Sequence, residues 1–162
     1  MNKRLKLVII ANTSNFFQVF MLNHIKQLSK KYNLFICCNN SRKLRKLLPA
    51  NVTLVDINFK RGIHLFHDII AFIYTLFFFF KIKPDLSISF TPKIGLIVSI
   101  SSFLVRTPKR VHWYTGQIWA NKKGFSKFFF RFIDKLIFLL SHCVLVDGIS
   151  QRKFLIKEKV IS

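Results

Sequence analysis

The sequence predicts an α/β protein with a Rossmann-like, doubly wound and mainly parallel sheet of six strands, flanked by helices. Six short runs rich in β-branched and apolar residues alternate with helical stretches along all 162 residues. Alternation of this kind specifies parallel strands joined by right-handed helical crossovers. Glycine and proline are rare and fall at the junctions, as at Pro84, Gly116 and Gly148. The chain is therefore expected to be one domain, residues 1–162, with no second domain.

The strands are predicted from their apolar runs. Residues 5–11 form a continuous run, which is typical of a strand buried on both faces. The other five strands are expected at residues 33–38, 52–57, 86–90, 110–114 and 143–146. Cys37 and Cys38 should face opposite sides of their strand as small buried hydrophobic residues. An odd number of cysteines without a signal peptide indicates reduced thiols in the cytoplasm.

The helices are predicted from apolar residues spaced three and four apart. Asn15 is expected to cap a helix over residues 16–30, and Ser41 a short helix over residues 42–48. The remaining helices are expected at residues 64–81, 94–105 and 125–140, and from Ser150 onward. A membrane-spanning helix is not expected, because the longest apolar run is shorter than the roughly 20 residues that a bilayer requires.

Two helices carry more apolar surface than one sheet can cover. The helix over residues 64–81 has its polar residues at its ends, so it is either deeply buried or in contact with lipid. The helix over residues 125–140 has a narrow polar stripe of Lys127, Arg131, Asp134 and Lys135. We expect the surplus apolar face to lie on the cytoplasmic leaflet of the membrane. A thick core or a partner domain is the alternative.

The charge of the chain indicates an acidic partner. Lys and Arg number 27 against 6 Asp and Glu, which gives a formal net charge of +21. Such an imbalance favours nucleic acid or an anionic lipid surface. Most of the aromatic residues are Phe inside apolar runs rather than aromatics interleaved with cations, so nucleic acid is the less favoured partner. The predicted location is the cytoplasm, peripheral to the inner face of the cell membrane.

Three polar loops follow predicted strands and form the candidate ligand-binding site. They contain Asn12, Thr13, Ser14 and Asn15 after the first strand, Thr91 and Lys93 after the fourth, and Thr115, Gly116 and Gln117 after the fifth. The carboxyl ends of parallel strands meet at one edge of a sheet, where such loops can bind a phosphate or a sugar hydroxyl. An ordinary capped turn is the alternative for the first loop. It lacks the glycines of a dinucleotide-binding loop, so no nicotinamide or flavin cofactor is expected.

Conventional catalytic motifs are missing from the sequence. The six acids are scattered, which argues against the paired carboxylates of a hydrolase. His112 is either a core histidine or a catalytic residue. His64, His67 and Asp68 resemble half of a metal site, but the start of a helix explains them equally well. We predict no metal.

Four segments of the chain resemble a known family. They read LVIIANTSNF, KPDLSISFTPKIGL, RVHWYTGQIW and DKLIFLLSHCVLVDGISQRKFLI. Their order is similar to the N-terminal, acceptor-side domain of bacterial glycosyltransferase family 4, whose members have the GT-B fold and include enzymes of capsule and O-antigen synthesis. The resemblance implies transfer of a sugar from a nucleotide-sugar donor to an acceptor, often lipid-linked, without a metal or cofactor. It also implies a catalytic residue near Thr115, or else His112.

The resemblance stops short of the donor-binding half of such enzymes. In the family that half carries a pair of Glu, whereas the only Glu in this chain is Glu158. The C-terminal donor domain is therefore expected to be absent, and the isolated chain is expected to be inactive without a separate donor-binding chain. The alternative function is a non-catalytic basic α/β protein that binds a membrane surface or nucleic acid.

Overall fold

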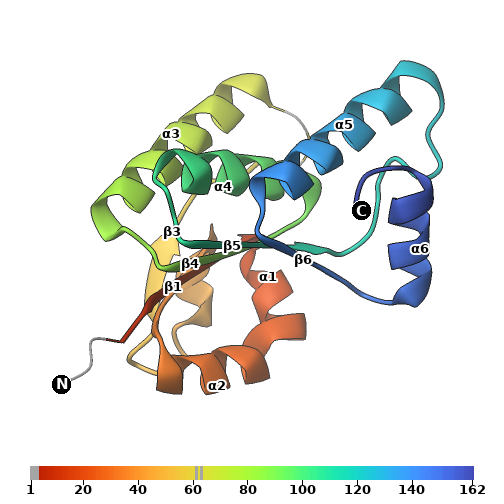
Figure 1. Cartoon of the computed structure of the whole chain (residues 1–162). Coiled ribbons are helices and arrows are strands. Elements are labelled where there is room, and N and C mark those ends of the chain that lie inside the picture. The colour runs from red at the N-terminus through yellow and green to blue at the C-terminus, as the bar shows by residue number, and fades with distance from the viewer. Residues whose placement is uncertain (1–3, 61, 63) are drawn as a thin grey trace.

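The computed structural model describes residues 4–60, 62 and 64–162 and contains one six-stranded sheet, all of whose strand pairs are parallel (Figure 1). The strand order is β3-β2-β1-β4-β5-β6. The strands are β1 (Lys6–Thr13), β2 (Asn33–Asn39), β3 (Thr53–Asp56), β4 (Leu86–Phe90), β5 (Lys109–Tyr114) and β6 (Cys143–Val146). This arrangement confirms the predicted doubly wound α/β fold.

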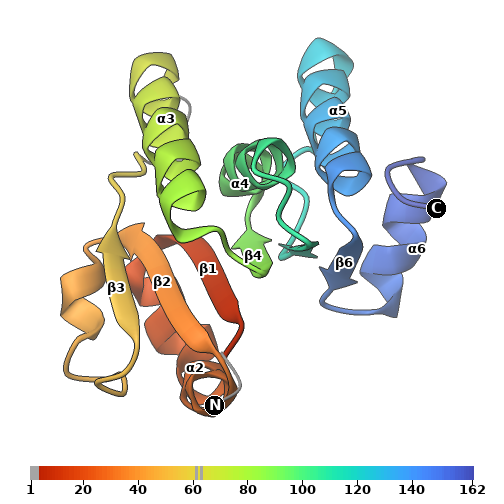
Figure 2. The same ribbon diagram turned by 60° about the vertical axis from the view of Figure 1, so that its left-hand side comes forward.

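Helices cover both faces of the sheet. Figure 1 shows α3, α4 and α5 on one face and α1 and α2 on the other, with α6 beside β6. Figure 2 shows α3 and α5 rising on either side of α4. The bounds are α1 (Ser14–Phe16), the π-helical η1 (Phe17–Met21), α2 (Leu22–Lys31), the 3₁₀ turn η2 (Ser41–Leu44), α3 (Leu65–Ile82), α4 (Pro92–Leu104), α5 (Gly124–Leu140) and α6 (Ile149–Lys157).

The two predicted helix caps are wrong. The first helix starts one residue before Asn15, and its N-cap is Thr13. The second helix is a single 3₁₀ turn whose N-cap is Asn40, not Ser41. Asn40 has φ of 57°, a left-handed conformation that asparagine tolerates, and the backbone N–H of Ser41 donates to Asp56 Oδ1 at 3.2 Å.

The core consists of two layers on opposite faces of the sheet and a third cluster around Tyr114, Trp119 and Leu155. Ile9, Ile36 and Cys38 belong to the layer beneath α1 and α2, whereas Val8 and Cys37 belong to the layer beneath α3 and α4. The two neighbouring cysteines are fully buried on opposite faces, as predicted. Alternation along buried parallel strands produces this division, because successive side chains point to opposite faces.

The long helix α3 is mostly exposed, so it is not deeply buried. Ala71, Thr75 and Phe79 are its only buried residues. By length and composition α3 is the one helix in the described part of the chain that is apolar enough to cross a membrane. We call the exposed apolar side chains of α3 and α5 the apolar helix face: Leu65, Phe66, Ile69, Ile70, Ile73, Tyr74, Phe77, Phe80, Phe125, Phe128, Phe129, Phe132 and Leu139.

The polar stripe predicted on α5 is divided in the structure. Lys127 and Arg131 form ion pairs with Glu158, at 2.9 and 3.3 Å, which connect α5 to the end of the chain. Asp134 is fully buried and accepts a hydrogen bond from Trp119 Nε1 at 2.6 Å. The sequence pattern placed Asp134 in the polar stripe and could not show its burial, because its hydrogen-bond partner lies in a loop rather than on the same helix.

Candidate functional site

The carboxyl edge of the sheet carries the three predicted loops. The strand order reverses its direction between β1 and β4, and ligands of open α/β sheets bind at the carboxyl ends of the strands at such a switch point. In the structure Asn12 and Thr13 end β1, Thr91 follows β4, and Thr115, Gly116 and Gln117 follow β5. The fold therefore brings these three loops to one edge.

The first loop offers amide and hydroxyl groups of different accessibility. Asn15 is exposed on α1, whereas Ser14 is only 3% exposed and faces the core. Asn12 is half-buried, and its Oδ1 atom has no hydrogen-bond partner among the described residues. A buried polar atom of this kind can accept a hydrogen bond from a ligand.

Thr91 has an unusual backbone conformation at the switch point. Its φ of 64° and ψ of 147° fall in a region that favours glycine, and threonine is β-branched. Such a conformation costs about 1–3 kcal/mol, and strained residues cluster at functional sites. The carbonyl of Thr91 accepts the Gly95 N–H at 2.7 Å, so the strained residue also begins α4.

Lys93 does not point into the predicted site. It lies in the first turn of α4, and its ammonium forms an ion pair with Asp68 Oδ1 at 2.5 Å. The same group donates to the carbonyls of Lys60 and Gly62, at 2.7 and 2.6 Å. Lys93 therefore ties α4 to the start of α3, and the prediction that it binds a phosphate is not supported by this geometry.

His112 is a core residue. Its side chain is fully buried under α4, where a Cβ atom on Gly95 would lie 2.4 Å from His112 Cε1. Nδ1 is 2.9 Å from Ser89 Oγ. Burial lowers the pKa of His112 to about 3, so the ring is neutral at physiological pH. A catalytic role for His112 would need contact with the substrate, which the packing of α4 prevents.

The predicted metal half-site is the start of a helix. The His64 N–H donates to Asp68 Oδ2 at 3.0 Å, and the other Asp68 oxygen pairs with Lys93. Across residues 4–60, 62 and 64–162, no group of three His, Cys, Asp or Glu side chains lies close enough to bind a metal ion.

A hydrogen-bond network joins the loop after β5 to the start of α6. Gln151 Nε2 donates to the Tyr114 carbonyl at 3.2 Å and to Gln117 Oε1 at 3.3 Å. Gln151 Oε1 accepts the Asp147 N–H at 2.7 Å. A pocket of about 510 Å³ lies against this network, lined by Gly116, Gln117, Ala120, Asp147, Gly148, Ser150, Gln151 and Phe154. Predicted residues Gly116 and Gln117 thus line a pocket at the carboxyl edge.

An adjoining pocket has an aromatic wall that sequence reasoning missed. Its volume is about 440 Å³, and its lining residues are Phe16, Phe20, Met21, Phe90, Trp113, Thr115 and Asp147. Four of these rings follow one another: the centroids of Phe20 and Phe16 are 5.5 Å apart, those of Phe16 and Phe90 4.6 Å, and those of Phe90 and Trp113 5.7 Å. Distances of this size are typical of aromatic contacts. We call these four rings the aromatic wall.

Asp147 is the carboxylate of the site and was also missed. It directly follows β6 and lines both edge pockets. Trp113 Nε1 donates to Asp147 Oδ1 at 2.8 Å, which fixes the carboxylate beside the aromatic wall. The signal in the sequence was the position of Asp147 between a predicted strand and Gly148, the same pattern that identified the other loops.

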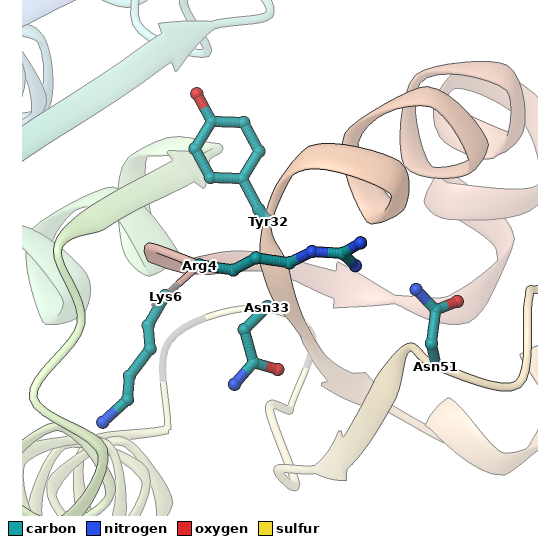
Figure 3. A pocket seen from close by; sticks show the side chains of 5 residues that line it. All are labelled: Arg4, Lys6, Tyr32, Asn33 and Asn51. Atoms are coloured by element: carbon teal, nitrogen blue, oxygen red, sulfur yellow. The ribbon is translucent and has the colours of Figure 1, made fainter. Parts of the chain in front are cut away.

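A third pocket lies at the opposite edge of the sheet. Figure 3 shows Arg4, Lys6, Tyr32, Asn33 and Asn51 around it, with the Tyr32 ring and the Lys6 ammonium pointing to opposite sides. Lys6 Nζ donates to the Ile82 carbonyl at 2.7 Å, at the end of α3. Because these side chains do not converge, the carboxyl edge remains the candidate site.

Comparison with known proteins relates the chain to enzymes of sugar metabolism. No protein-family model matches it. It is 31% identical over 117 residues to the capsular polysaccharide biosynthesis glycosyltransferase CapM of Staphylococcus aureus, which covers 72% of this chain and 30% of CapM. The chain thus spans less than a third of the length of that relative.

Solved structures have the same fold. The Acinetobacter baumannii MurG structure has a TM-score of 0.61 at 13% identity, covering 89% of this chain and 42% of MurG. The UDP-GlcNAc 2-epimerase of Methanocaldococcus jannaschii has a TM-score of 0.64 at 16% identity, covering 98% of this chain and 45% of the epimerase. The chain is therefore a homologue of the bacterial capsule glycosyltransferase CapM, with the fold of one half of a GT-B enzyme.

Proposed function

We propose that this chain is the acceptor-binding half of a glycosyltransferase of cell-surface polysaccharide synthesis. The enzyme moves a sugar from a nucleotide-sugar donor to a lipid-linked saccharide acceptor. The observation that carries the proposal is the homology to CapM, a capsule glycosyltransferase. The acceptor lies along the carboxyl edge, where Asn12, Thr91 and Thr115 provide polar contacts. Thr115 is the predicted catalytic residue that lines a pocket.

The donor is bound by residues outside this sequence. Glu158, the only Glu of the chain, is engaged by Lys127 and Arg131 on the surface of α5 and does not face the carboxyl-edge pockets. These 162 residues therefore bind an acceptor without turning it over, and transfer requires a separate donor-binding chain or domain. Neither a metal nor a redox cofactor takes part in the proposed reaction.

The protein works at the inner face of the cell membrane. The apolar helix face presents large side chains to solvent, including Phe66 at 73% and Phe128 at 58% exposure. Exposed cations border it at Lys81 and Lys83 and again at Lys122 and Lys123. Apolar side chains inserted among lipid headgroups bind the membrane, and each neighbouring cation contributes about 1 kcal/mol at an anionic surface.

Co-sedimentation with vesicles tests the membrane location. The protein should pellet with phosphatidylglycerol-containing vesicles at low salt and less with neutral phosphatidylcholine vesicles. The double variant Phe66→Ser, Phe128→Ser should lose most of this binding. Val19→Ser is the matched control, because Val19 is 71% exposed on the other side of the sheet. No pelleting with anionic vesicles, or equal loss in the control, would contradict the proposed location.

Ligand binding tests the proposed function itself. We expect the isolated chain to bind undecaprenyl-diphosphate-linked saccharides in detergent, measured by calorimetry, with much weaker binding of nucleotide sugars. It should release no nucleotide from any nucleotide sugar until a donor-binding chain is added. Tight binding of a nucleotide sugar without binding of a saccharide carrier would overturn the assignment of this half to the acceptor.

A further inference from the structure

We propose that the pocket with the aromatic wall holds an uncharged pyranose ring of the acceptor, whose hydroxyl groups donate hydrogen bonds to Asp147. This inference rests on the proposed function and names the part of the substrate that the pocket recognises. It is carried by the juxtaposition of four aromatic rings with one oriented carboxylate, in a pocket of about 440 Å³.

The aromatic wall provides a surface on which a sugar can stack. The faces of aromatic rings carry partial negative charge, and the C–H groups of a pyranose carry partial positive charge because oxygen atoms neighbour them. Phe20 is 64% exposed and Trp113 is half-buried, so ring surface is accessible at both ends of the wall. Phe90 is buried between them and supports the wall from the end of β4.

Asp147 provides the hydrogen-bond acceptor that such a ligand needs. Its Oδ1 atom accepts from Trp113 Nε1, and among the described residues no donor lies within hydrogen-bond distance of Oδ2. A carboxylate oxygen in this position can accept a hydrogen bond from a sugar hydroxyl. Hydrogen bonds to charged groups are stronger than neutral ones, so a single contact of this kind selects for the position of the hydroxyl group.

Charge distinguishes a sugar from the other parts of a lipid-linked acceptor. Among the described residues, no lysine or arginine lines either carboxyl-edge pocket. A diphosphate beside Asp147 would be repelled, and a hydrocarbon chain would remove water from the carboxylate without replacing its hydrogen bonds. A neutral polyhydroxylated ring can stack on the aromatic wall and also donate hydrogen bonds to the carboxylate.

The backbone at η1 positions one end of the pocket. Residues Phe17–Met21 form a π-helical turn between α1 and α2. Such turns are rare in proteins, and those that occur often lie at functional sites. Here the wider turn buries Phe17 in the core and leaves Phe20 on the pocket side, where it contacts Phe16.

Indole resonances offer a direct test, because the chain has two tryptophans. In a ¹H–¹⁵N spectrum, the indole signal that Trp113→Phe removes belongs to Trp113. Titration with neutral methyl pyranosides, among them methyl N-acetylglucosaminide, should shift this signal with a millimolar dissociation constant. The Trp119 indole is fully buried against Asp134 and serves as the internal reference.

Two variants and one matched control assign the contacts. Phe20→Ala should weaken binding about twofold to tenfold. Asp147→Asn keeps an acceptor for Trp113 Nε1 but loses the charge, and should weaken binding about tenfold or more. Val19→Ala lies in the same turn, is 71% exposed and does not line the pocket, so it should bind like the wild type.

The outcomes separate this inference from the proposed function. If saccharide carriers bind the chain but never shift the Trp113 indole, the pocket assignment is wrong and the acceptor function stands. A shift caused by uridine but by no pyranoside, or pyranoside binding unchanged in Asp147→Asn, also overturns the assignment. If no carrier and no pyranoside binds, the proposed function fails with it.

Discussion

The buried carboxyl of Asp134 should contribute a stabilisation of the folded state that is lost as the pH rises. Asp134 is fully buried, and burial raises its pKa from 3.8 to about 6, although the hydrogen bond from Trp119 acts in the opposite direction. The folded state therefore holds this proton more tightly than the unfolded state does. The stabilising contribution of the protonated form is complete below about pH 4 and is lost as the pH rises through about 6.

The size of this effect follows from the pKa shift. A rise in the pKa from 3.8 to about 6 corresponds to about 3 kcal/mol. About half of it, roughly 1.4 kcal/mol, should develop between about pH 5 and pH 8. His112 opposes this trend, because its pKa is lowered to about 3 and its contribution is lost as the pH falls below about 6.5. The wild type alone should therefore show a shallow profile.

The comparison of wild type with Asp134→Asn isolates the effect. Urea unfolding of both proteins from about pH 5 to pH 8 gives the difference in free energy of unfolding at each pH. Asparagine can still accept from Trp119 Nε1 and does not ionise, so the variant should gain stability relative to the wild type as the pH rises. Trp119→Phe removes the hydrogen bond that lowers the pKa and should steepen the dependence. A difference that stays flat over this range in both variants refutes the reasoning.

Three other substitutions test packing, backbone strain and ion pairing. Gly95→Ala should lower stability by about 1–2 kcal/mol in urea unfolding, because the new Cβ atom would lie 2.4 Å from His112 Cε1. Gly148→Ala is the control, because a Cβ atom at that position has no other atom within 4 Å. Thr91→Gly should raise stability by about 1 kcal/mol in the same assay, because relief of strain exceeds the entropy cost of glycine. Glu158→Gln should lower stability by less than about 1 kcal/mol near neutral pH. This difference should vanish as the pH falls, because the hydrogen bond from Lys127 lowers the pKa of Glu158 and is lost when the carboxylate is protonated. A difference that grows at low pH would contradict the ion pairs.

The sequence was sufficient to predict the sheet and the edge at which the three polar loops meet. The strands 86–90 and 143–146 have the predicted bounds, because apolar runs flanked by turn residues determine them locally. The loops after β1, β4 and β5 were identified correctly as neighbours, since parallel strands place their carboxyl ends together. Their roles as ligand contacts stay predictions.

Contacts between residues far apart in the chain could not be predicted from the sequence. Lys93 was assigned to ligand binding, but it pairs with Asp68 on another helix. Asp134 was placed in the polar stripe of its helix, but it is buried and Trp119 is its partner. The aromatic wall joins Phe16, Phe90 and Trp113, which meet only because β1, β4 and β5 are adjacent in the sheet. The spacing of apolar residues describes one helix or strand at a time and contains no information on contacts between different elements.

The exposure of Phe20 has a consequence for how new specificities could arise in this scaffold. Phe90 lies at the centre of the aromatic wall and is buried in the core, so a substitution there would change both the stability of the fold and the shape of the pocket. Phe20 is 64% exposed at the rim, and its replacement leaves the buried layers untouched. In the proposed sugar site, a library of aromatic, aliphatic and polar residues at this single position would therefore change the rim of the pocket at nearly constant stability.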